Sequence, residues 1–413
     1  MRRDSTNLRF RCQCQPERIF SRESEGISAL RIAIIVERFA PGAGGVENVA
    51  WQVAHELART GEDVTVLTRK GEPNTERVDS ALPRVTVQSL PVPHAWQPLR
   101  VVAFSRATAI ATRRGAFDVV HSFSRTRHQH LYRAGGGSHR DYMRRNYSPF
   151  GSLLRQFSPR HRVLLSIEAR VFADATQRIQ CASRLVADAL VSDHGVSPAR
   201  ILLLPNAVDS NRYGAPAALE AGRRLRSELD EKAEQIWLFP ASGWHRKGLR
   251  TVFEALSQIR DPGLRLWIAG RDEPRPWLRI ASGLGVADRI RFLGPRDDLE
   301  VVYGAVDGMV LPTRYDAFAN VTLEAAASGL PIITTRSNGA AECLEGAISL
   351  VESANDPVAL AQAFEQLTDQ ERRRELGQRA RAIASRLDWA QHVSHLRDEY
   401  RRIVEARAGR RFQ

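Results

Sequence analysis

The sequence is poor in the features that mark secreted and membrane-spanning proteins. Its 413 residues include only four cysteines, Cys12, Cys14, Cys181 and Cys343, and so low a usage fits a reducing compartment. No apolar run approaches the roughly 18–20 residues that a membrane-spanning helix requires. Residues 1–29 are basic but lack the apolar core of a secretory signal, so we expect a disordered extension there and a cytoplasmic protein overall.

Signatures of metal and dinucleotide binding are also missing. The chain contains no Asp-x-Asp triplet of the kind that bridges a divalent cation to a diphosphate. The pair Cys12 and Cys14 has no second pair and no histidine at zinc-finger spacing, so free thiols are the simpler interpretation. No Gly-x-Gly-x-x-Gly fingerprint occurs, which argues against a dinucleotide-dependent dehydrogenase. We therefore expect no metal and no cofactor.

The net charge of +13 narrows the partners to anionic ones. Nucleic acid, an anionic membrane face and phosphorylated substrates would each suit such a surface. The sequence has no RNA-recognition strand signature and no zinc-finger ligands, so we expect no nucleic-acid partner. Charge alone leaves the other two open.

Apolar runs and helical patterns alternate from residue 30 onward. Leu30–Val36 is a continuous apolar run of buried-strand length, and apolar residues recur at helical spacing from Val46 to Ala58. The strand Asp63–Thr68 then completes a β-α-β unit, the opening of a doubly wound domain. Ser183 is a candidate N-cap for a helix after Cys181. Further strands are predicted at Val85–Leu90, Asp118–Ser122, Leu131–Arg133, Arg178–Cys181 and Ile201–Leu204.

The pattern restarts after a polar segment, rich in alanine and arginine, that ends near Lys232. The sequence therefore predicts an α/β fold of two Rossmann-like doubly wound domains facing across a cleft. We expect an acceptor domain at residues 30–205, joined by the C-terminal helix 389–408, and a donor domain at 206–388. The second domain's predicted strands are Ile236–Ala241, Leu264–Ala269, Ile290–Leu293, Gly308–Leu311 and Ile332–Thr335, and its predicted helices include Leu249–Ile259 and Val321–Ser328.

Ligands of open α/β sheets bind at the carboxyl ends of the strands, so the loops there are candidate sites. The loop after the first strand places Gly44 and Gly45 before a helix, where a phosphate or sugar can approach backbone N–H groups. An ordinary tight turn would look the same. The loop 242–248 offers Arg246 and Lys247, a planar fork and a point charge that suit a diphosphate. A lone Arg-Lys pair is also common in solvated turns.

The loop 312–324 carries the most specific pattern. Asp316 lies in the loop, and Glu324 falls in the first turns of the helix that follows. The N–H groups of residues 318–320 would open that helix and could hold a phosphate or sugar oxygen. Glu324 can accept both ribose hydroxyls, as acids do in nucleotide sites, and Asp316 can accept sugar hydroxyls. One such acid is often only a complement to the helix dipole, but an acid pair, a cationic loop and a glycine loop in order indicate one site.

These residues resemble a known family. The segment YDAFANVTLEAAASGLPIITT, residues 315–335, resembles the hallmark of retaining glycosyltransferases of the GT-B fold, in which two acids eight residues apart flank a Phe-Gly-like turn. The resemblance runs from about residue 30 to 388 and looks closest to lipopolysaccharide core glucosyltransferases. Further matches, in order along the chain, are LYRAGGGSHRDY (131–142), LPNAVD (204–209), RKG (246–248), AG and GRDEPR (269–275) and FLG (292–294).

The resemblance implies a role for each matching residue. Arg246 and Lys247 would bind the donor diphosphate, Glu324 the ribose, and Asp316 the transferred sugar. The transfer would be front-face, with the leaving phosphate helping to deprotonate the acceptor while the two cations stabilise the departing diphosphate. The donor site would also include Gly44, Gly45, Gly243, Gly270, Arg296 near the nucleobase, and the turn residues Ala317, Phe318, Ala319 and Asn320.

Two positions depart from the family pattern. Asp316 replaces the usual Glu and is one methylene shorter, which puts the donor preference in question. Gly136 stands where related sequences tend to have an acid, so no obvious carboxylate is present there. His130 and His139 flank the Leu131–Arg133 strand, and either could contact the acceptor or the sugar; a structural or surface histidine is an equal alternative for each.

The acceptor side mixes cations with apolar anchors between residues 139 and 162. Such a mixture suits an anionic leaflet, or phosphorylated sugars on a lipid anchor, and we favour a membrane-facing role over simple packing on the domain. The residues are Arg140, Arg144, Arg145, Arg155, Arg160 and Arg162 with Tyr142, Met143, Tyr147, Phe150, Leu153, Leu154 and Phe157.

The sequence thus predicts a metal-independent, retaining hexosyltransferase. Its donor would be a nucleotide-sugar, a UDP-sugar such as UDP-glucose. Its acceptor would be a glycan or glycolipid such as lipopolysaccharide core, at the inner face of the cytoplasmic membrane. A nucleotide-sugar epimerase of the same fold is an alternative that the turn from Asp316 to Glu324 disfavours. A catalytically inactive scaffold is another, and intact Arg246 and Lys247 argue against it.

Overall fold

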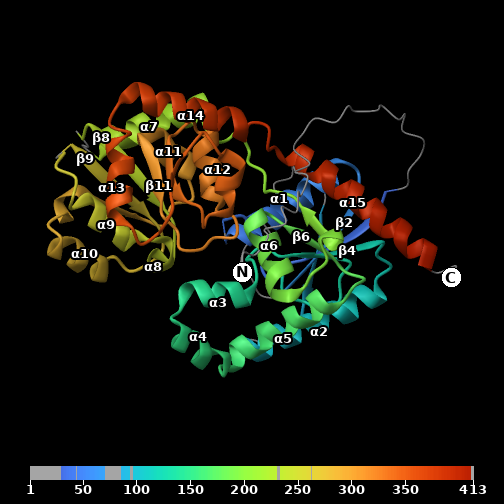
Figure 1. The fold of residues 1–413 in the computed structure, drawn as a ribbon. Helices are drawn as coiled ribbons and strands as arrows, with labels where there is room; N and C mark the ends of the chain where they lie inside the picture. The colour runs from blue at the N-terminus through green and yellow to red at the C-terminus, as the bar shows by residue number, and fades with distance from the viewer. Residues whose placement is uncertain are drawn as a thin grey trace, which may run out of the picture.

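The computed structural model describes residues 29–42, 44–69, 85–93, 96–229, 233–261 and 263–410. These residues form two parallel sheets with helices packed around them, lying side by side (Figure 1). The predicted α/β fold of two Rossmann-like doubly wound units is confirmed. Residues 1–28 of the predicted extension, with Cys12 and Cys14, lie outside the described residues.

The first sheet has seven strands in the order β3-β2-β1-β4-β5-β6-β7, all parallel. Together with its helices and the C-terminal helix α15 we call it the N-terminal half. Its central strands β1 and β4 are buried almost throughout because helices cover both faces of the sheet. The strands are β1 (Arg31–Ile35), β2 (Asp63–Arg69), β3 (Thr86–Leu90), β4 (Val119–Ser122), β5 (Leu131–Arg133), β6 (Arg178–Cys181) and β7 (Ile201–Leu203).

The second sheet has six strands in the order β10-β9-β8-β11-β12-β13, also parallel. With its helices it forms what we call the C-terminal half. Five of its strands match predicted ones, whereas the three-residue β13 was not predicted. The strands are β8 (Gln235–Pro240), β9 (Leu264–Ala269), β10 (Ile290–Gly294), β11 (Gly308–Leu311), β12 (Ile332–Thr335) and β13 (Ser349–Val351).

Helices connect successive strands. Ser183 caps α6 by accepting the Val186 N–H at 3.3 Å, as predicted. The helices of the N-terminal half are α1 (Gly45–Arg59), α2 (Gln97–Arg114), α3 (His139–Asn146), α4 (Pro149–Gln156), α5 (Pro159–Ala173), α6 (Arg184–His194) and α15 (Trp389–Arg410). Those of the C-terminal half are α7 (Pro216–Glu228), α8 (Trp244–Lys247), α9 (Leu249–Leu256), α10 (Pro274–Gly283), α11 (Leu299–Ala305), α12 (Asn320–Ala327), α13 (Pro357–Glu365) and α14 (Gln370–Ala384). Short 3₁₀ turns occupy Pro198–Arg200, Ala287–Arg289 and Gly339–Leu344.

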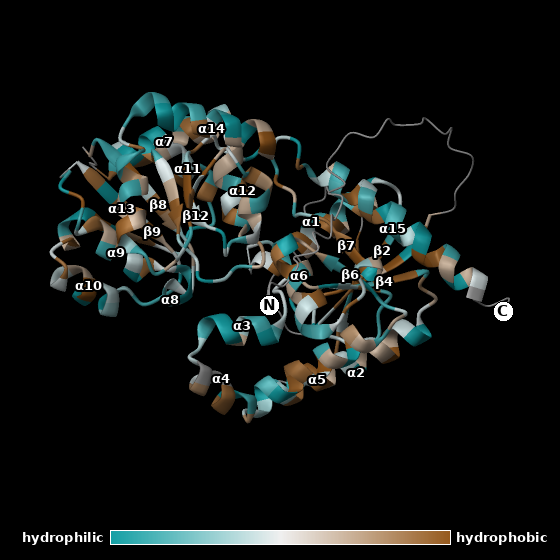
Figure 2. Cartoon of the chain, in the orientation of Figure 1, coloured by the Kyte–Doolittle hydropathy of each residue, from teal (hydrophilic) through white to brown (hydrophobic). Residues whose placement is uncertain are grey.

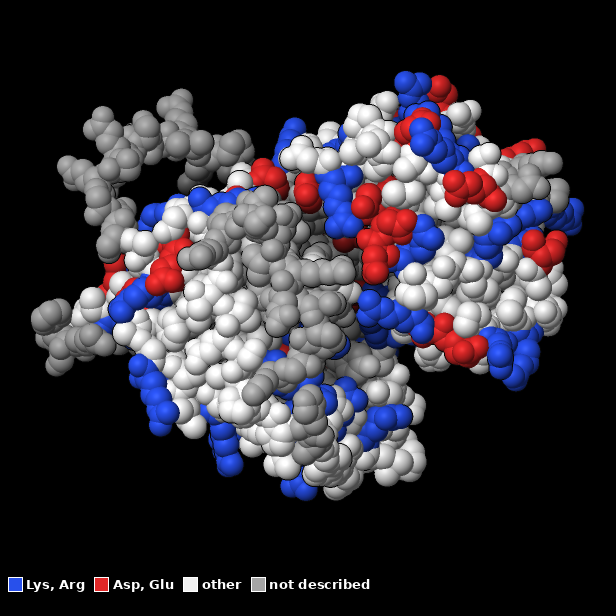
Figure 3. All heavy atoms as spheres, turned by 180° about the vertical axis from the view of Figure 1, so that it is seen from behind, with Lys and Arg blue, Asp and Glu red and all other residues white. Residues whose placement is uncertain are grey.

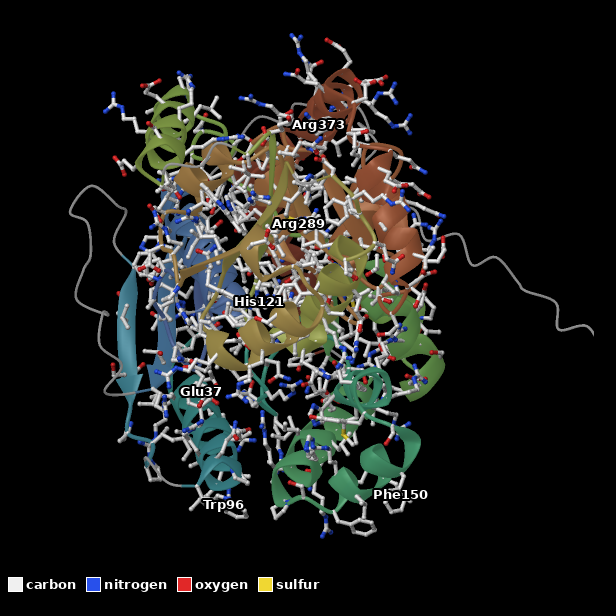
Figure 4. The ribbon with its side chains drawn as sticks, turned by 90° about the vertical axis from the view of Figure 1, so that its left-hand side faces the viewer. Glu37, Trp96, His121, Phe150, Arg289 and Arg373 are labelled. Carbon is white, nitrogen blue, oxygen red and sulfur yellow. The ribbon has the colours of Figure 1, made fainter. Side chains whose placement is uncertain are left out.

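The C-terminal helix α15 lies along the N-terminal half, away from the sheet that precedes it in the chain (Figure 1). Val393, Leu396 and Tyr400 of α15 are buried against the first sheet. Tyr400 also shares a 2.7 Å hydrogen bond between its hydroxyl and Nδ1 of His121 in β4, inside the molecule (Figure 4). The chain therefore crosses between the halves twice, after β7 and before α15.

Apolar residues concentrate in the strands and the inner helix faces (Figure 2). Exposed large apolar side chains gather on α2 and α4 at one end of the N-terminal half, and single ones lie on α10 and α13. In the described part of the chain, no helix has the length and hydropathy to cross a bilayer.

The two halves contact each other at the carboxyl ends of their strands. Ser183 Oγ donates to the Ala317 carbonyl at 2.8 Å, and the Arg271 guanidinium donates to the Gly42 carbonyl at 2.9 Å. The loops with the predicted chemistry thus meet between the sheets, where doubly wound folds place their ligands.

Candidate active site

Two cations and one carboxylate converge where β8 and β11 end. The Lys247 ammonium forms an ion pair with Asp316 Oδ2, and the Arg246 guanidinium lies 3.8 Å from the same oxygen. Arg246 also donates to the Tyr315 carbonyl at 2.7 Å. The structure therefore brings these three predicted residues together, although they are about 70 positions apart in sequence.

Burial and charge act in opposite directions on this cluster. Burial disfavours the charged form of Asp316, but Lys247 and Arg246 outweigh it and hold the pKa of the carboxyl below its usual value. Burial lowers the pKa of the Lys247 ammonium, and the Asp316 carboxylate offsets part of that effect. The side chain of Arg246 is 31% exposed, so it remains open to an anionic ligand.

The loop predicted at 242–248 contains the one-turn helix α8, which is a difference from the prediction. The Asp272 carboxylate causes it, because it accepts the N–H groups of Gly243 at 2.7 Å and Trp244 at 3.1 Å. Gly248 ends the turn with φ +84°, and a Cβ there would lie 2.1 Å from the Pro312 carbonyl oxygen. The cationic loop can therefore seat against the acidic loop only with glycine at this position.

The turn after Asp316 is shaped by a residue that sequence reasoning missed. Asn338 is fully buried, and its Oδ1 accepts the Ala319 N–H at 3.3 Å while its Nδ2 donates to Thr322 Oγ1 at 2.9 Å. Asp316 Oδ1 accepts the Phe318 N–H at 3.1 Å. These bonds hold the start of α12 in place. The only signal in the sequence was an asparagine soon after the strand β12.

Glu324 lies in the first turns of α12, as predicted, and lines a small pocket with Asn48 and Gln52 of α1. Tyr303 donates to its Oε2 at 3.3 Å. Burial raises the pKa of Glu324 to about 7, and the hydrogen bond from Tyr303 and the charge of Arg212 oppose that rise. Its carboxyl therefore titrates near neutral pH and is positioned between the two halves.

The glycine loop meets the start of α12 directly. Gly44 precedes α1 and Gly45 is its first residue. Asn320 Nδ2 donates to the Gly45 carbonyl at 3.3 Å, and Asn320 Oδ1 accepts from Asn206 Nδ2 at 2.7 Å. The N-termini of α1 and α12 therefore lie close together, and each presents backbone N–H groups and the positive end of a helix dipole.

The remaining predicted donor residues surround this cluster at different depths. Gly270 packs tightly, since a Cβ there would lie 2.2 Å from the Ala241 carbonyl oxygen. Arg296 lies after β10, but its guanidinium is already paired with Asp298, with Nε 2.8 Å from Oδ1. Ala317, Phe318 and Ala319 are buried, and the N–H groups of Phe318 and Ala319, which were predicted to face a ligand, already donate to Asp316 and Asn338.

The structure gives each of the two predicted histidines a partner within the N-terminal half. His139 is 5% exposed, and its Nε2 shares a 2.7 Å hydrogen bond with Nδ1 of His161. Burial lowers its pKa to about 3, so the ring is neutral. His130 precedes β5, at the edge of the sheet opposite the strand carboxyl ends, and its Nδ1 accepts the Val120 N–H at 3.0 Å. Both placements favour the structural alternative for these side chains.

Helix α3 joins the acceptor side to the donor loop. The Arg145 guanidinium lies 5.5 Å from the centre of the Tyr315 ring, next to Asp316 in sequence. Arg145 and Arg144 both pair with the buried Asp141, at 2.9 and 2.7 Å. An acceptor bound along α3 would therefore be adjacent to the predicted sugar position.

No three histidine, cysteine, aspartate or glutamate side chains of the described residues gather in a way that could hold a metal ion. A cavity of about 1110 Å³ also lies between the halves, along the two chain crossings. It is lined by Ser183, Asn206 and His392, among others, and includes none of the predicted site residues.

Comparison with known proteins identifies both halves. A family model described as Glycosyltransferase Family 4 matches residues 43–212, and one described as Glycosyl transferases group 1 matches residues 234–370. The D-inositol 3-phosphate glycosyltransferase of Acidothermus cellulolyticus is 29% identical, over 91% of each chain. The lipopolysaccharide core biosynthesis glycosyltransferase LpsE of Rhizobium meliloti is 36% identical, over 34% of this chain and 42% of its own.

Solved structures agree on the fold. WaaG, a glycosyltransferase involved in lipopolysaccharide biosynthesis, superposes with a TM-score of 0.76 at 21% identity, covering 89% of this chain and 99% of WaaG. Anabaena HepE, solved in complex with UDP and glucose, superposes with a TM-score of 0.69 at 18% identity, covering 90% and 99%. The chain is therefore a GT-B glycosyltransferase of the group 1 and family 4 type, and it resembles lipopolysaccharide core enzymes.

Proposed function

We propose that this glycosyltransferase moves a hexose from a UDP-sugar, with retention and without a metal, to a glycan or lipid-linked acceptor such as lipopolysaccharide core. The observation that carries the proposal is the convergence of Arg246 and Lys247 on Asp316, beside the N-terminus of α12. Two cations and a helix N-terminus at one place fit a diphosphate, and an acid between them fits the hydroxyls of the attached sugar.

The surroundings support a nucleotide-sugar in particular. Glu324 lies one helix turn further along α12, facing α1 of the N-terminal half, and in this proposal its carboxylate accepts the ribose diol. HepE was solved with UDP and with glucose, and the same fold here carries the cations in its second half. The distinction between UDP and other nucleotides rests on this likeness, and so does the choice of hexose.

The residues account for the departure of the leaving group. Arg246 is partly exposed, and Lys247 is held in place by its ion pair with Asp316. A diphosphate that binds between the two cations would lose its hydration water and gain contacts with charges that are already in position. Negative charge grows on the diphosphate as the bond between the sugar and the phosphate breaks. The preorganised cations therefore stabilise the transition state more strongly than they stabilise the bound substrate. Retention follows if the acceptor hydroxyl attacks from the same face and passes its proton to the leaving phosphate.

The acceptor side fits an anionic membrane surface. On α4 and just after it, Phe150, Leu153, Leu154 and Phe157 have more than half of their surface exposed, and Trp96 beside α2 is 64% exposed. Figure 4 shows Trp96 and Phe150 pointing outward at the same end of the molecule. Figure 3 shows basic side chains with few acidic ones near that end, while both signs intermix over the C-terminal half. Apolar anchors among cations suit an anionic leaflet.

A donor panel tests the proposal. Nucleotide release would be measured from UDP-, GDP- and ADP-sugars in EDTA, with rough-type lipopolysaccharide, D-inositol 3-phosphate or no acceptor. The proposal predicts release from one UDP-sugar, stimulated by the lipopolysaccharide, with an α-linked product from an α-linked donor. Dependence on a divalent metal, or interconversion of the sugar without transfer, would contradict it and favour a different mechanism or the epimerase.

A further inference from the structure

A buried guanidinium lies under the donor site without a counter-charge. Arg133, at the end of β5, is 3% exposed. Its Nη2 donates to Asn206 Oδ1 at 2.7 Å, and its carbon Cζ lies 5.4 Å from the centre of the Phe123 ring. Within the described residues its Nε and Nη1 have no hydrogen-bond partner, and it forms no ion pair.

Such a cation is costly to the fold. Burial lowers the pKa of Arg133 to about 10, because the charged form loses its hydration and gains no carboxylate in return. A methionine or glutamine would fill the same space at less cost. We therefore look for the function of the Arg133 guanidinium in the hydrogen bond that it donates.

The fork holds the first link of a hydrogen-bond chain that crosses the active site. Arg133 fixes the Asn206 amide with its oxygen inward, so its nitrogen faces Asn320 Oδ1 at 2.7 Å. That orientation turns the Asn320 nitrogen toward the Gly45 carbonyl at 3.3 Å. We call these four residues, Arg133, Asn206, Asn320 and Gly45, the relay.

The direction of the relay is set from both ends. An amide can point either way, but the Arg133 guanidinium only donates and the Gly45 carbonyl only accepts, so the two amides between them have one orientation that satisfies every link. The last two members are the first residues of α12 and α1, one from each half. The relay thus fixes the spacing of two helix N-termini. The positive ends of their dipoles repel each other, and an anion bound between them would relieve that repulsion.

We infer that Arg133 is a positioning residue for the transfer reaction, holding the N-termini of α1 and α12 through Asn206 and Asn320 in the arrangement that receives the donor diphosphate. This inference rests on the proposed function. It extends the donor site to a residue of the N-terminal half that touches neither the donor nor the acceptor.

The test uses three variants of the full chain, with UDP as the probe. Arg133→Met removes the donor and the uncompensated charge. In Asn206→Asp the new carboxylate still accepts a hydrogen bond from Arg133 but cannot donate one to Asn320. Asn320 would then have to donate to position 206, which reverses the second hydrogen bond of the relay. Gln180→Met is the matched control, because Gln180 is a buried polar residue of the neighbouring strand β6 outside the relay. Thermal melting and UDP calorimetry are measured for each, followed by donor KM and kcat.

The inference predicts that Arg133→Met and Asn206→Asp melt at or above the wild-type temperature and bind UDP roughly 10-fold more weakly, the effect of one hydrogen bond to a charged group. In both relay variants the donor KM should rise in parallel with the dissociation constant for UDP. Gln180→Met should change neither the donor KM nor the UDP affinity. Unchanged UDP binding in both relay variants would overturn the inference, and so would a fall in melting temperature that parallels the loss of binding. If the wild-type chain binds neither UDP nor UDP-glucose, the proposed function itself fails, which is a separate outcome.

Discussion

The donor loop of the C-terminal half and the helices α4 and α5 of the N-terminal half place their charged side chains in opposite surroundings. Around Asp316, each charged side chain meets an opposite charge or a fixed backbone group. On α4 and α5, Arg155, Arg160 and Arg162 are exposed, and Phe150 and Phe157 point to solvent beside them. The first region is held together by contacts within the chain, whereas the second presents basic and apolar side chains to solvent.

The difference indicates where substitutions should act. A change at Arg246, Lys247 or Asp316 should alter both the reaction rate and the stability of the fold, because these side chains are joined by ion pairs. A change on the α4 surface should alter neither, and should affect only association with an anionic interface. The following predictions test that separation, from the largest expected effect to the smallest.

Loss of both donor cations should have the largest effect. Arg246→Ala with Lys247→Met should lower kcat/KM for the donor by roughly 1,000-fold or more, since groups that stabilise transition-state charge contribute about 100–1,000-fold each. Arg250→Ala is the matched control, because Arg250 lies on α9, is 63% exposed and pairs with Glu254. A double variant within 10-fold of wild type, with an unchanged melting temperature, would contradict the assigned roles.

The α4 surface should respond in the opposite sense. Phe150→Ser with Phe157→Ser should weaken binding to vesicles containing anionic lipid by at least about 100-fold, because each exposed Phe contributes about 1.5–3 kcal/mol on burial. Turnover of a soluble acceptor should stay within twofold of wild type. Vesicle co-sedimentation and a soluble assay measure the two effects, and Leu278→Ser, an exposed apolar residue on α10, serves as the control. Equal losses in both assays would mean that α4 supports the fold instead.

Breaking the buried ion pair should cost stability. Asp316→Asn leaves the Lys247 ammonium buried without its counter-charge, so the free energy of unfolding should fall by about 3 kcal/mol. Adding Lys247→Met should recover much of that loss without restoring activity. Urea unfolding of the single and double variants measures the coupling. Strictly additive losses would show that the two side chains do not stabilise each other.

Glu324 should give an effect that is absent at low pH and at most equals that of Asp316→Asn at high pH. Its pKa of about 7 lies above that of an unfolded chain, so folding takes up a proton between about pH 4.5 and pH 7. The free energy of unfolding therefore falls as pH rises through that window, by up to about 3 kcal/mol at completion. Glu324→Gln should remove this loss, raising the melting temperature at pH 8 but not at pH 4.

Donor binding should change in the other direction. In the proposed function, ionised Glu324 would accept both ribose hydroxyls, so wild-type affinity for the donor should rise between pH 6 and pH 8, and the Gln variant should show a flat profile. A wild-type profile that is already flat would mean that Glu324 does not contact the ribose.

The sequence was sufficient for the sheets and for the donor pair. The strands from β1 to β12 matched predicted ones, most clearly where a buried parallel strand is a continuous apolar run, as in 236–240 and Gly308–Leu311. Arg246, Lys247 and Asp316 were identified from a family pattern and meet as expected. Their roles in catalysis remain predictions.

What the sequence did not provide depends on contacts between distant residues. The turn α8 exists because Asp272 reaches back to Gly243 and Trp244. The helix α7 falls in a segment that looked like a polar linker, since its apolar face is weak. Gly222 of α7 instead packs directly on Gly304 of α11, where a Cβ would lie 2.3 Å from backbone. In a sequence, a glycine is usually taken to end a helix. Only the structure shows that Gly222 allows the backbones of α7 and α11 to approach each other closely.

The relay and the histidines illustrate the same limit. Nothing in the sequence linked Arg133 to Asn206, 73 positions away, or Asn206 to Asn320, 114 positions away. His139 and His130 were plausible because they flank a strand, but His139 is enclosed by His161 and His130 lies at the far edge of the sheet. Sequence spacing indicates which strand a residue borders, not the direction in which its side chain points.

Calorimetric titration of UDP in EDTA tests the central claim most directly. It would compare wild type, the Arg246→Ala/Lys247→Met variant and the Phe150→Ser/Phe157→Ser variant. The account predicts one site per chain in wild type, binding at least 100-fold weaker in the cation variant, and unchanged binding in the surface variant. UDP binding that survives loss of both cations, or that appears only with a divalent metal, would contradict it.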